Sequence, residues 1–219
     1  MLSIQEFIVK NNKYFSLKTS FSDAVDVLIN KNLTHFPVVE NEVFLGNLSL
    51  NDAETFSQTS LVEDARTLLD AFYVRENSLW FEVLELFSKH QANIVPVLNK
   101  KNKLIGYYLF EDVISFFNET PFLKENGTTI IVEKEILSYS ISQISQIFES
   151  NNSKIFGIFM NEVNENTAQI TIKSLSININ DIIQTLRRYD YNIITEHFED
   201  QFLSDLKDRS EYLDKYLNI

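Results

Sequence analysis

The chain contains one sequence pattern twice, and this internal repeat constrains its fold more than any other feature. Each copy has a proline within an apolar run, then a glycine, then an aspartate: Pro37, Gly46 and Asp52 in the first, and Pro96, Gly106 and Asp112 in the second. The copies are 59 residues apart at the prolines and 60 apart at the glycines, which places a one-residue insertion in Asn99–Lys103. Because this insertion falls in a predicted turn, the pattern indicates that a whole structural unit was duplicated.

Each copy reads as a short strand, an amphipathic helix, two strands joined by a tight turn, and a second helix. Apolar residues recur at helical spacing before each proline, and strand-length apolar runs follow. The predicted helices are at 24–29 and 83–87, the strands at 36–40, 43–48, 94–98 and 104–109, and the second helices from 52 and over 111–118. Between the copies, Ser60-Leu61-Val62-Glu63 predicts a capping box that opens another helix.

Composition limits the classes of protein to which this chain can belong. With 219 residues, 44% of them hydrophobic, the chain can form two or three small packed domains. A net charge of −12 argues against nucleic-acid binding, because phosphate contacts need a clustered basic surface. The absence of cysteine excludes disulfides and fits a reducing cytoplasm. No apolar stretch is long enough for a membrane helix, and no signal peptide or membrane association is expected.

The repeated pattern resembles the CBS domain. Its specific part is the two blocks of proline, glycine and aspartate in register, each with a helix upstream. The resemblance covers roughly residues 1–122 and implies two CBS repeats, at 1–60 and 61–122. It also implies that the two repeats pack face to face by their sheets, as one Bateman module.

The end of the first copy places polar groups where a nucleotide could bind. Gly46 permits close approach of the backbone, and Ser49 and Asp52 lie on the same side of a first helical turn. A carboxylate there can accept hydrogen bonds from both ribose hydroxyls, while Ser49 and the free N–H groups of the helix would face a phosphate. The alternative is that Ser49 and Asp52 only cap the helix, as such residues commonly do.

The resemblance implies an adenine-nucleotide site in the first copy. CBS modules of this kind place an aspartate on the ribose and a hydroxyl near the phosphate, which matches Asp52 and Ser49. His35 matches a basic phosphate contact and Thr19 another polar contact, although a lone histidine beside a strand is commonly structural. The candidate ligand-binding residues are Thr19, His35, Pro37, Gly46, Ser49 and Asp52.

The second copy is a poorer site. Leu109 replaces the hydroxyl residue, and Ile94 aligns with His35 and cannot contact a phosphate by charge. We therefore expect this site to be empty or to accept a different ligand. Its candidate residues are Ser78, Pro96, Gly106 and Asp112.

The C-terminal third predicts a separate α+β domain. Gly127 marks a boundary, and residues 127–199 read as strand, helix, strand, strand, helix, strand, which is the ferredoxin-like order. After a CBS pair this order resembles the ACT domain, a regulatory module. The loop Lys134–Ser140 lacks the Asp and Gly of the usual ACT ligand loop, so assembly through sheet pairing is favoured over amino-acid binding. An amphipathic helix is predicted over residues 200–219.

The sequence favours a regulatory protein over an enzyme. Its three histidines are far apart, and no nucleophile, phosphate-loop or metal-ligand motif is present. The leading hypothesis is a sensor that binds AMP, ADP, ATP or a similar adenine nucleotide as a regulatory ligand and signals through the ACT-like domain or an unidentified protein partner. The alternative is a ligand-free dimerisation scaffold. Both hypotheses predict a homodimer with no cofactor or metal.

Overall fold

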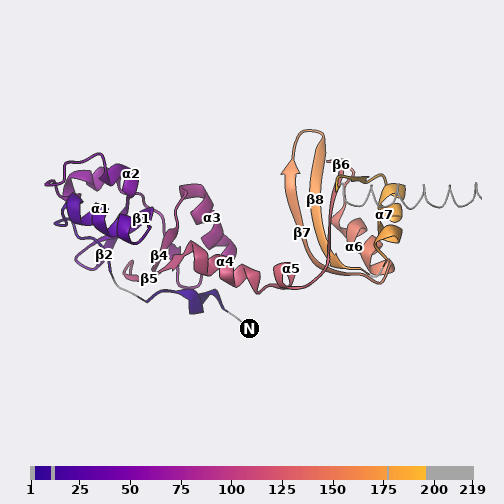
Figure 1. Cartoon of the computed structure of the whole chain (residues 1–219), viewed down its shortest axis with the longest axis horizontal. Coiled ribbons are helices and arrows are strands. Elements are labelled where there is room, and N and C mark those ends of the chain that lie inside the picture. The colour runs from indigo at the N-terminus through magenta and orange to yellow at the C-terminus, as the bar shows by residue number, and fades with distance from the viewer. Residues whose placement is uncertain (1–2, 11–12, 177, 196–219) are drawn as a thin grey trace, which may run out of the picture. The chain divides into compact units, whose positions relative to one another are not determined.

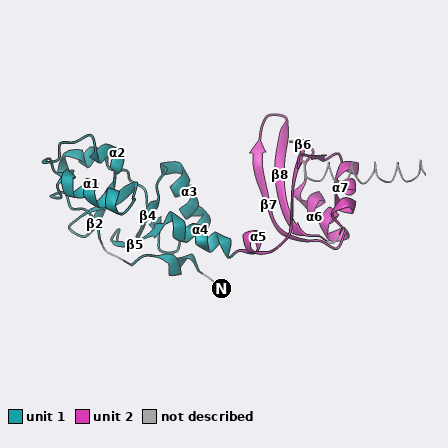
Figure 2. Ribbon diagram, in the orientation of Figure 1, with its two compact units in different colours: residues 1–119 teal, residues 120–219 magenta. Residues whose placement is uncertain are grey.

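The computed structural model describes residues 3–10, 13–176 and 178–195. It divides into two compact units, residues 1–119 and 120–219, coloured separately in Figure 2. The first unit contains both sequence repeats, and the second contains the predicted ferredoxin-like domain. The fold is therefore α+β, and each unit has a hydrophobic core of its own.

The first repeat forms a helix, an antiparallel strand pair and a short second helix (Figure 1). Helix α1 begins where Ser20 accepts a hydrogen bond from the Asp23 backbone N–H at 3.1 Å, which satisfies a free donor of the first turn. The two predicted strands are confirmed. The elements are α1 (Phe21–Asn30), β1 (His35–Glu40), β2 (Val43–Ser49) and α2 (Leu50–Ala53).

The second repeat has the same order and adds a short parallel strand. The strands predicted at 94–98 and 104–109 are confirmed, with β4 antiparallel to β5 and parallel to β3. In the first repeat, a single parallel bridge from Phe15 to Val38 replaces β3. The elements are β3 (Val74–Arg75), α3 (Trp80–His90), β4 (Ile94–Leu98), β5 (Leu104–Leu109) and α4 (Phe110–Asn118).

The segment that begins each predicted repeat packs on the core of the other repeat. The 3₁₀-helix η1 (Ile4–Phe7) contributes Ile4 to the second core, and Val9 pairs with Tyr107 of β5. In the same way, η2 (Val62–Leu68) contributes Val62 and Ala65 to the first core. The predicted boundary between residues 60 and 61 thus divides the two repeats in the sequence. Each hydrophobic core, however, contains residues from both sides of this boundary.

The helix predicted after Ser60 differs in type and in capping. It is the 3₁₀-helix η2, and the backbone N–H of Leu61, the residue before it, donates to the carboxylate of Asp64 at 3.1 Å. The capping residue is therefore one position later than the predicted Glu63. Backbone bonds to Leu17 and Thr19 hold the start of η2 against the first repeat.

Equivalent residues of the two repeats meet at their joint. Thr34 and Asn93, which are 59 residues apart, exchange two hydrogen bonds: Thr34 N–H donates to Asn93 Oδ1 at 2.9 Å, and Asn93 N–H donates to Thr34 Oγ1 at 3.0 Å. Nearby, Phe36 of β1 lies edge-on to Tyr107 of β5, with ring centroids 6.2 Å apart. Such reciprocal contacts between aligned positions are expected where two copies face each other across an approximate twofold axis.

The second unit has the ferredoxin-like βαββαβ order that the sequence predicted. Its antiparallel sheet has the strand order β7-β8-β6-β9, and both long helices pack on one face (Figure 1). Alternate residues of β8 are buried, as expected for a sheet covered on one side. The elements are α5 (Pro121–Lys124), β6 (Thr128–Glu135), α6 (Ile141–Ser150), β7 (Lys154–Val163), β8 (Thr167–Leu175), α7 (Ile179–Arg188) and β9 (Asn192–Ile193).

Two predicted boundaries change in this part of the chain. Phe122, placed by prediction in the second repeat, packs edge-on against Phe159 of β7 at 4.6 Å and belongs to the second unit. The strand predicted over 191–198 is shorter, because β9 covers only 192–193 and residues 191, 194 and 195 lie outside the strand. The last three residues of that prediction and the helix predicted over 200–219 lie outside the described residues. Within the residues that the structure describes, every helix is too short or too polar to span a membrane.

Candidate functional site

A cavity of about 650 Å³ brings together polar residues of both repeats and of the segment between them. It opens beside the N-terminus of α2, the start of β1 and the C-terminus of α3. Its lining residues are Leu28, Ile29, Asn32, Leu33, Thr34, His35, Ser49, Leu50, Asn51, Asp52, Asp70, His90 and Gln91.

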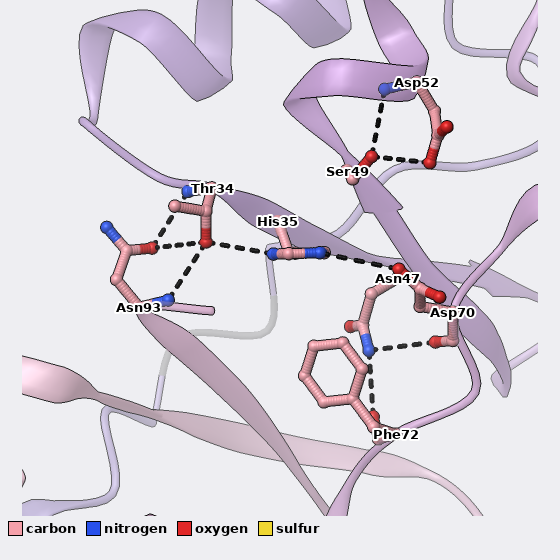
Figure 3. Close-up of polar contacts among 8 residues, drawn as sticks. All are labelled: Thr34, His35, Asn47, Ser49, Asp52, Asp70, Phe72 and Asn93. Atoms are coloured by element: carbon pink, nitrogen blue, oxygen red, sulfur yellow. Dashed lines mark hydrogen bonds and ion pairs between the residues drawn. The ribbon is translucent and has the colours of Figure 1, made fainter. Parts of the chain in front are cut away.

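Ser49 and Asp52 form the N-terminal cap of α2 and also lie in the cavity wall (Figure 3). Asp52 N–H donates to Ser49 Oγ at 3.0 Å, and the Ser49 hydroxyl donates to Asp52 Oδ2 at 2.5 Å. Ser49 and Asp52 therefore cap the helix, as the alternative interpretation of the sequence predicted. Among the described residues no donor contacts Asp52 Oδ1, so this oxygen can still accept a hydrogen bond from a ligand in the cavity.

His35 begins β1 and is buried between two polar partners. Its Nδ1 lies 2.9 Å from Thr34 Oγ1, and its Nε2 lies 3.5 Å from Asp70 Oδ2. Burial lowers the pKa of His35, and the nearby Asp70 carboxylate opposes this shift only in part. His35 is therefore mainly neutral at neutral pH. A carboxylate can only accept hydrogen bonds, so the neutral tautomer that fits has its proton on Nε2 and donates it to Asp70. Its Nδ1 then accepts a hydrogen bond from the Thr34 hydroxyl.

Asp70 reaches the cavity because the segment between the repeats pairs with the edge of β2. The backbone groups of Asn47 and Asp70 exchange two hydrogen bonds of 2.9 Å. The Asn47 amide also donates to the backbone oxygens of Asp70 and Phe72, at 3.2 and 2.8 Å (Figure 3). No sequence signal pointed to Asp70, because it lies outside both copies of the repeated block.

The close approach at Gly46 is to the protein's own backbone. A Cβ at this position would lie 2.8 Å from Leu69 Cβ and 3.3 Å from the Asp70 carbonyl oxygen. The missing side chain thus makes room for the segment that carries Asp70, and Gly46 is not among the residues that line the cavity. In the second repeat, Gly106 makes equivalent room for Val9, whose carbonyl oxygen would be 2.6 Å from the added Cβ.

The structure separates two further candidates from this cavity. Thr19 lines another cavity of about 360 Å³ with Lys13 and Lys31, and its Oγ1 accepts a hydrogen bond from Ser16 N–H. Pro37 lies within β1 opposite Asn47 and is not among the lining residues. Of the six residues predicted in the first copy, the cavity therefore gathers His35, Ser49 and Asp52.

The second copy lacks the polar groups that surround the first cavity. Asp112 lies in the first turn of α4, but Leu109 at the cap position offers no side-chain acceptor. Pro96 pairs with Tyr107, and the Ser78 hydroxyl accepts a hydrogen bond from Arg75 N–H at 3.3 Å. Positions equivalent to His35 and Asp70 are occupied by Ile94 and Val9, neither of which can bind a polar group through its side chain.

The fold and the cavity define a tandem α+β repeat module in which the two copies face each other and enclose a polar site. A family model for the CBS domain matches residues 4–56 and 62–119, just over half of the chain. The chain therefore belongs to the CBS-domain family and holds its domains as a tandem pair.

Three solved structures show similarity over about half of the chain. A CBS domain pair/ACT domain protein from Thermotoga maritima is 16% identical, with a TM-score of 0.48 over 54% of this chain and 98% of that one. The CBS domains of a transcriptional regulator from Streptococcus pneumoniae are 18% identical, with a TM-score of 0.46 over 52% and 98%. CBSX2, solved in complex with AMP, is 21% identical, with a TM-score of 0.44 over 53% and 96%.

The cavity side chains do not form a metal site in this arrangement. Across the part of the chain that the structure describes, no three His, Cys, Asp or Glu side chains are placed to hold one ion. His90 instead stacks on Phe72, with ring centroids 4.1 Å apart, and His35 lies edge-on to the same ring. Both imidazoles of the cavity therefore contact the same aromatic ring.

Proposed function

We propose that this protein is a non-catalytic sensor whose CBS pair binds an adenine nucleotide in the cavity beside Asp52. The single observation that carries the proposal is the Asp52 carboxylate, which lies in the wall of a large cavity with one oxygen available. Such a carboxylate can accept hydrogen bonds from both hydroxyls of a ribose. Ser49 and His35 lie in the same wall and offer further polar contacts.

Binding can regulate only if the nucleotide prefers one of two states of the protein. The cavity wall includes residues of the first repeat, the connecting segment and α3 of the second repeat. A ligand that contacts all three favours one arrangement of the two repeats over others. We propose that this change passes to the ferredoxin-like, ACT-like unit or to a protein partner, and that the protein works as a homodimer in the cytoplasm.

The test is thermal unfolding of the full chain with and without AMP, ADP or ATP. A ligand present at about 100 times its dissociation constant adds about 2.7 kcal/mol to the stability of the native state. We expect Asp52→Ala to abolish the shift in melting temperature. Asp112→Ala is the matched control, since it removes the equivalent aspartate of the second copy, and it should keep the full shift.

The second candidate function is a ligand-free dimerisation scaffold. The observation that favours it is the exposed apolar surface on the second repeat, where Leu79, Phe81 and Phe110 are 67, 55 and 42% exposed. Apolar surface of this kind is typical of interfaces. No melting shift with any of the three nucleotides, together with a sedimentation mass near twice 25.5 kDa, would favour the scaffold over the sensor.

A further inference from the structure

The wall of the candidate cavity has two acidic side chains and no strongly basic one. Asp52 and Asp70 line it, whereas none of the described lining residues is a lysine or an arginine. Aspartate side chains are negatively charged at neutral pH. The cavity therefore presents negative charge to whatever enters it, which is unusual for a site that accepts several phosphate groups.

His35 does little to offset this charge. His35 is mainly neutral because burial lowers its pKa, although it lies 3.5 Å from the Asp70 carboxylate. His90 is stacked on Phe72. The Asp70 side chain is 45% exposed, so its charge faces the cavity and the solvent at its mouth.

Other groups that could hold phosphates are also few. Helix α2 has only four residues, so its dipole is small, and the Ser49 hydroxyl is already used in the cap. The remaining polar side chains of the wall are uncharged: Asn32, Thr34, Asn51 and Gln91. Uncharged donors can bind a sugar, a base or one phosphate, but they do not compensate the charge of a triphosphate.

We propose that Asp70 makes this cavity selective for adenine ligands of low negative charge, so that adenosine and its monophosphate bind and the triphosphate is rejected. This inference rests on the proposed function and narrows its ligand class. Its physical basis is repulsion between Asp70 and the added phosphates, which grows with the charge of the ligand. Asp70 is thereby a specificity-determining residue that the repeated sequence block does not contain.

The test is calorimetric titration of the full chain with adenosine, AMP and ATP at low salt and without divalent cations. In the unchanged protein we expect ATP to bind at least about tenfold more weakly than AMP. In Asp70→Asn, ATP should bind at least about fivefold more tightly than before, with adenosine changed by less than about twofold. Asparagine can still accept a hydrogen bond from His35 Nε2, so the local structure should be retained.

The matched control is Glu63→Gln, which removes the same charge from an exposed position of the same segment. It should leave the affinity ratio of ATP to AMP unchanged. ATP binding as tightly as AMP in the unchanged protein would overturn the inference while leaving the proposed function standing. A failure of all three ligands to bind would overturn both.

The salt dependence of the unchanged protein gives a second readout that needs no variant. Salt screens repulsion at an exposed carboxylate. Raising the salt concentration from about 50 to 500 mM should therefore reduce the difference in affinity between AMP and ATP. If the affinity for ATP instead falls with salt more than the affinity for AMP does, the phosphates are attracted to the cavity, and the proposed role of Asp70 is wrong.

Discussion

At the scale of single residues, the environment of His35 links the candidate site to the joint between the repeats. His35 contacts Thr34 Oγ1, and that hydroxyl group accepts a hydrogen bond from Asn93 N–H of the other repeat (Figure 3). The Thr34 hydroxyl lies within hydrogen-bond distance of both His35 Nδ1 and Asn93 Oδ1, at 2.9 and 3.1 Å, and a proton on Nδ1 leaves only Asn93 Oδ1 as its acceptor. The protonation state of this buried imidazole therefore affects the hydrogen bond of the Thr34 hydroxyl, whereas the hydrogen bonds donated by the backbone N–H groups of Thr34 and Asn93 do not depend on it.

The lowered pKa of His35 predicts a component of stability that depends on pH. In the unfolded chain this histidine takes up a proton near its ordinary pKa of 6.5, and in the folded protein it does so only at lower pH. The unfolded state therefore binds more protons as the pH falls below about 6.5, so the free energy of unfolding must fall across that range. Above that range the contribution is fully present.

Urea unfolding at pH 7.5 and 5.5 checks this, with the unchanged protein and His35→Gln compared in parallel. The loss of stability on acidification should be smaller in the variant, because glutamine does not titrate. The comparison of the two proteins removes the contributions of carboxylates and of the other histidines. An identical loss in both proteins would show that His35 does not bind a proton differently on folding.

At the scale of the elements, a glycine in β2 determines where the connecting segment lies. Gly46 has a φ of 157° and faces Leu69, and the neighbouring Asn47 holds Asp70 and Phe72 by hydrogen bonds. A side chain at Gly46 would push this segment away from the strand edge. The same glycine thus contributes to both the fold of the first repeat and the position of Asp70.

Gly46→Ala should destabilise the first unit by about 1–3 kcal/mol, because the added Cβ would lie 2.8 Å from Leu69 Cβ and the backbone conformation disfavours a side chain. Denaturant unfolding measures the change. The control is Glu54→Ala, an exposed residue at the end of α2, which should change stability by less than about 0.5 kcal/mol. Equal stabilities of the two variants would mean that the segment can shift without cost.

At the scale of the whole molecule, each of the two units has the core residues it needs. The two clusters of the first unit contain only residues from its own range, and the sheet and helices of the second unit form a third cluster. Cores that share no residue can fold independently. We therefore expect each unit to fold as a separate domain.

A fragment of residues 1–119 should fold cooperatively and bind AMP with the affinity of the full chain, within about twofold. Circular dichroism melting and calorimetric titration measure these two properties. The contrasting fragment, residues 10–119, lacks η1 and should be less stable, because Ile4 packs in the core of the second repeat. A fragment 1–119 that fails to fold would show that the second unit contributes to the stability of the first.

The longer helices and strands follow from the amino-acid sequence alone. Periodic apolar residues and turn residues are local signals, so the duplication, the strands at 94–98 and 104–109 and the ferredoxin-like order follow from them. Local signals also placed Ser49 and Asp52 at a helix start. In each of these cases the residues that determine the structure are neighbours in the chain.

Two features depend on the packing of distant segments: the set of residues that share the cavity and the segment that completes each core. Asp70 and His90 join His35 from distant positions, and Thr19 lies in another cavity. The exchange of segments between the repeats likewise depends on pairing at the edges of two strands. Asn47 of β2 pairs with Asp70, and Tyr107 of β5 pairs with Val9. Such contacts depend on the packing of the two copies, and no local pattern in the chain records that packing.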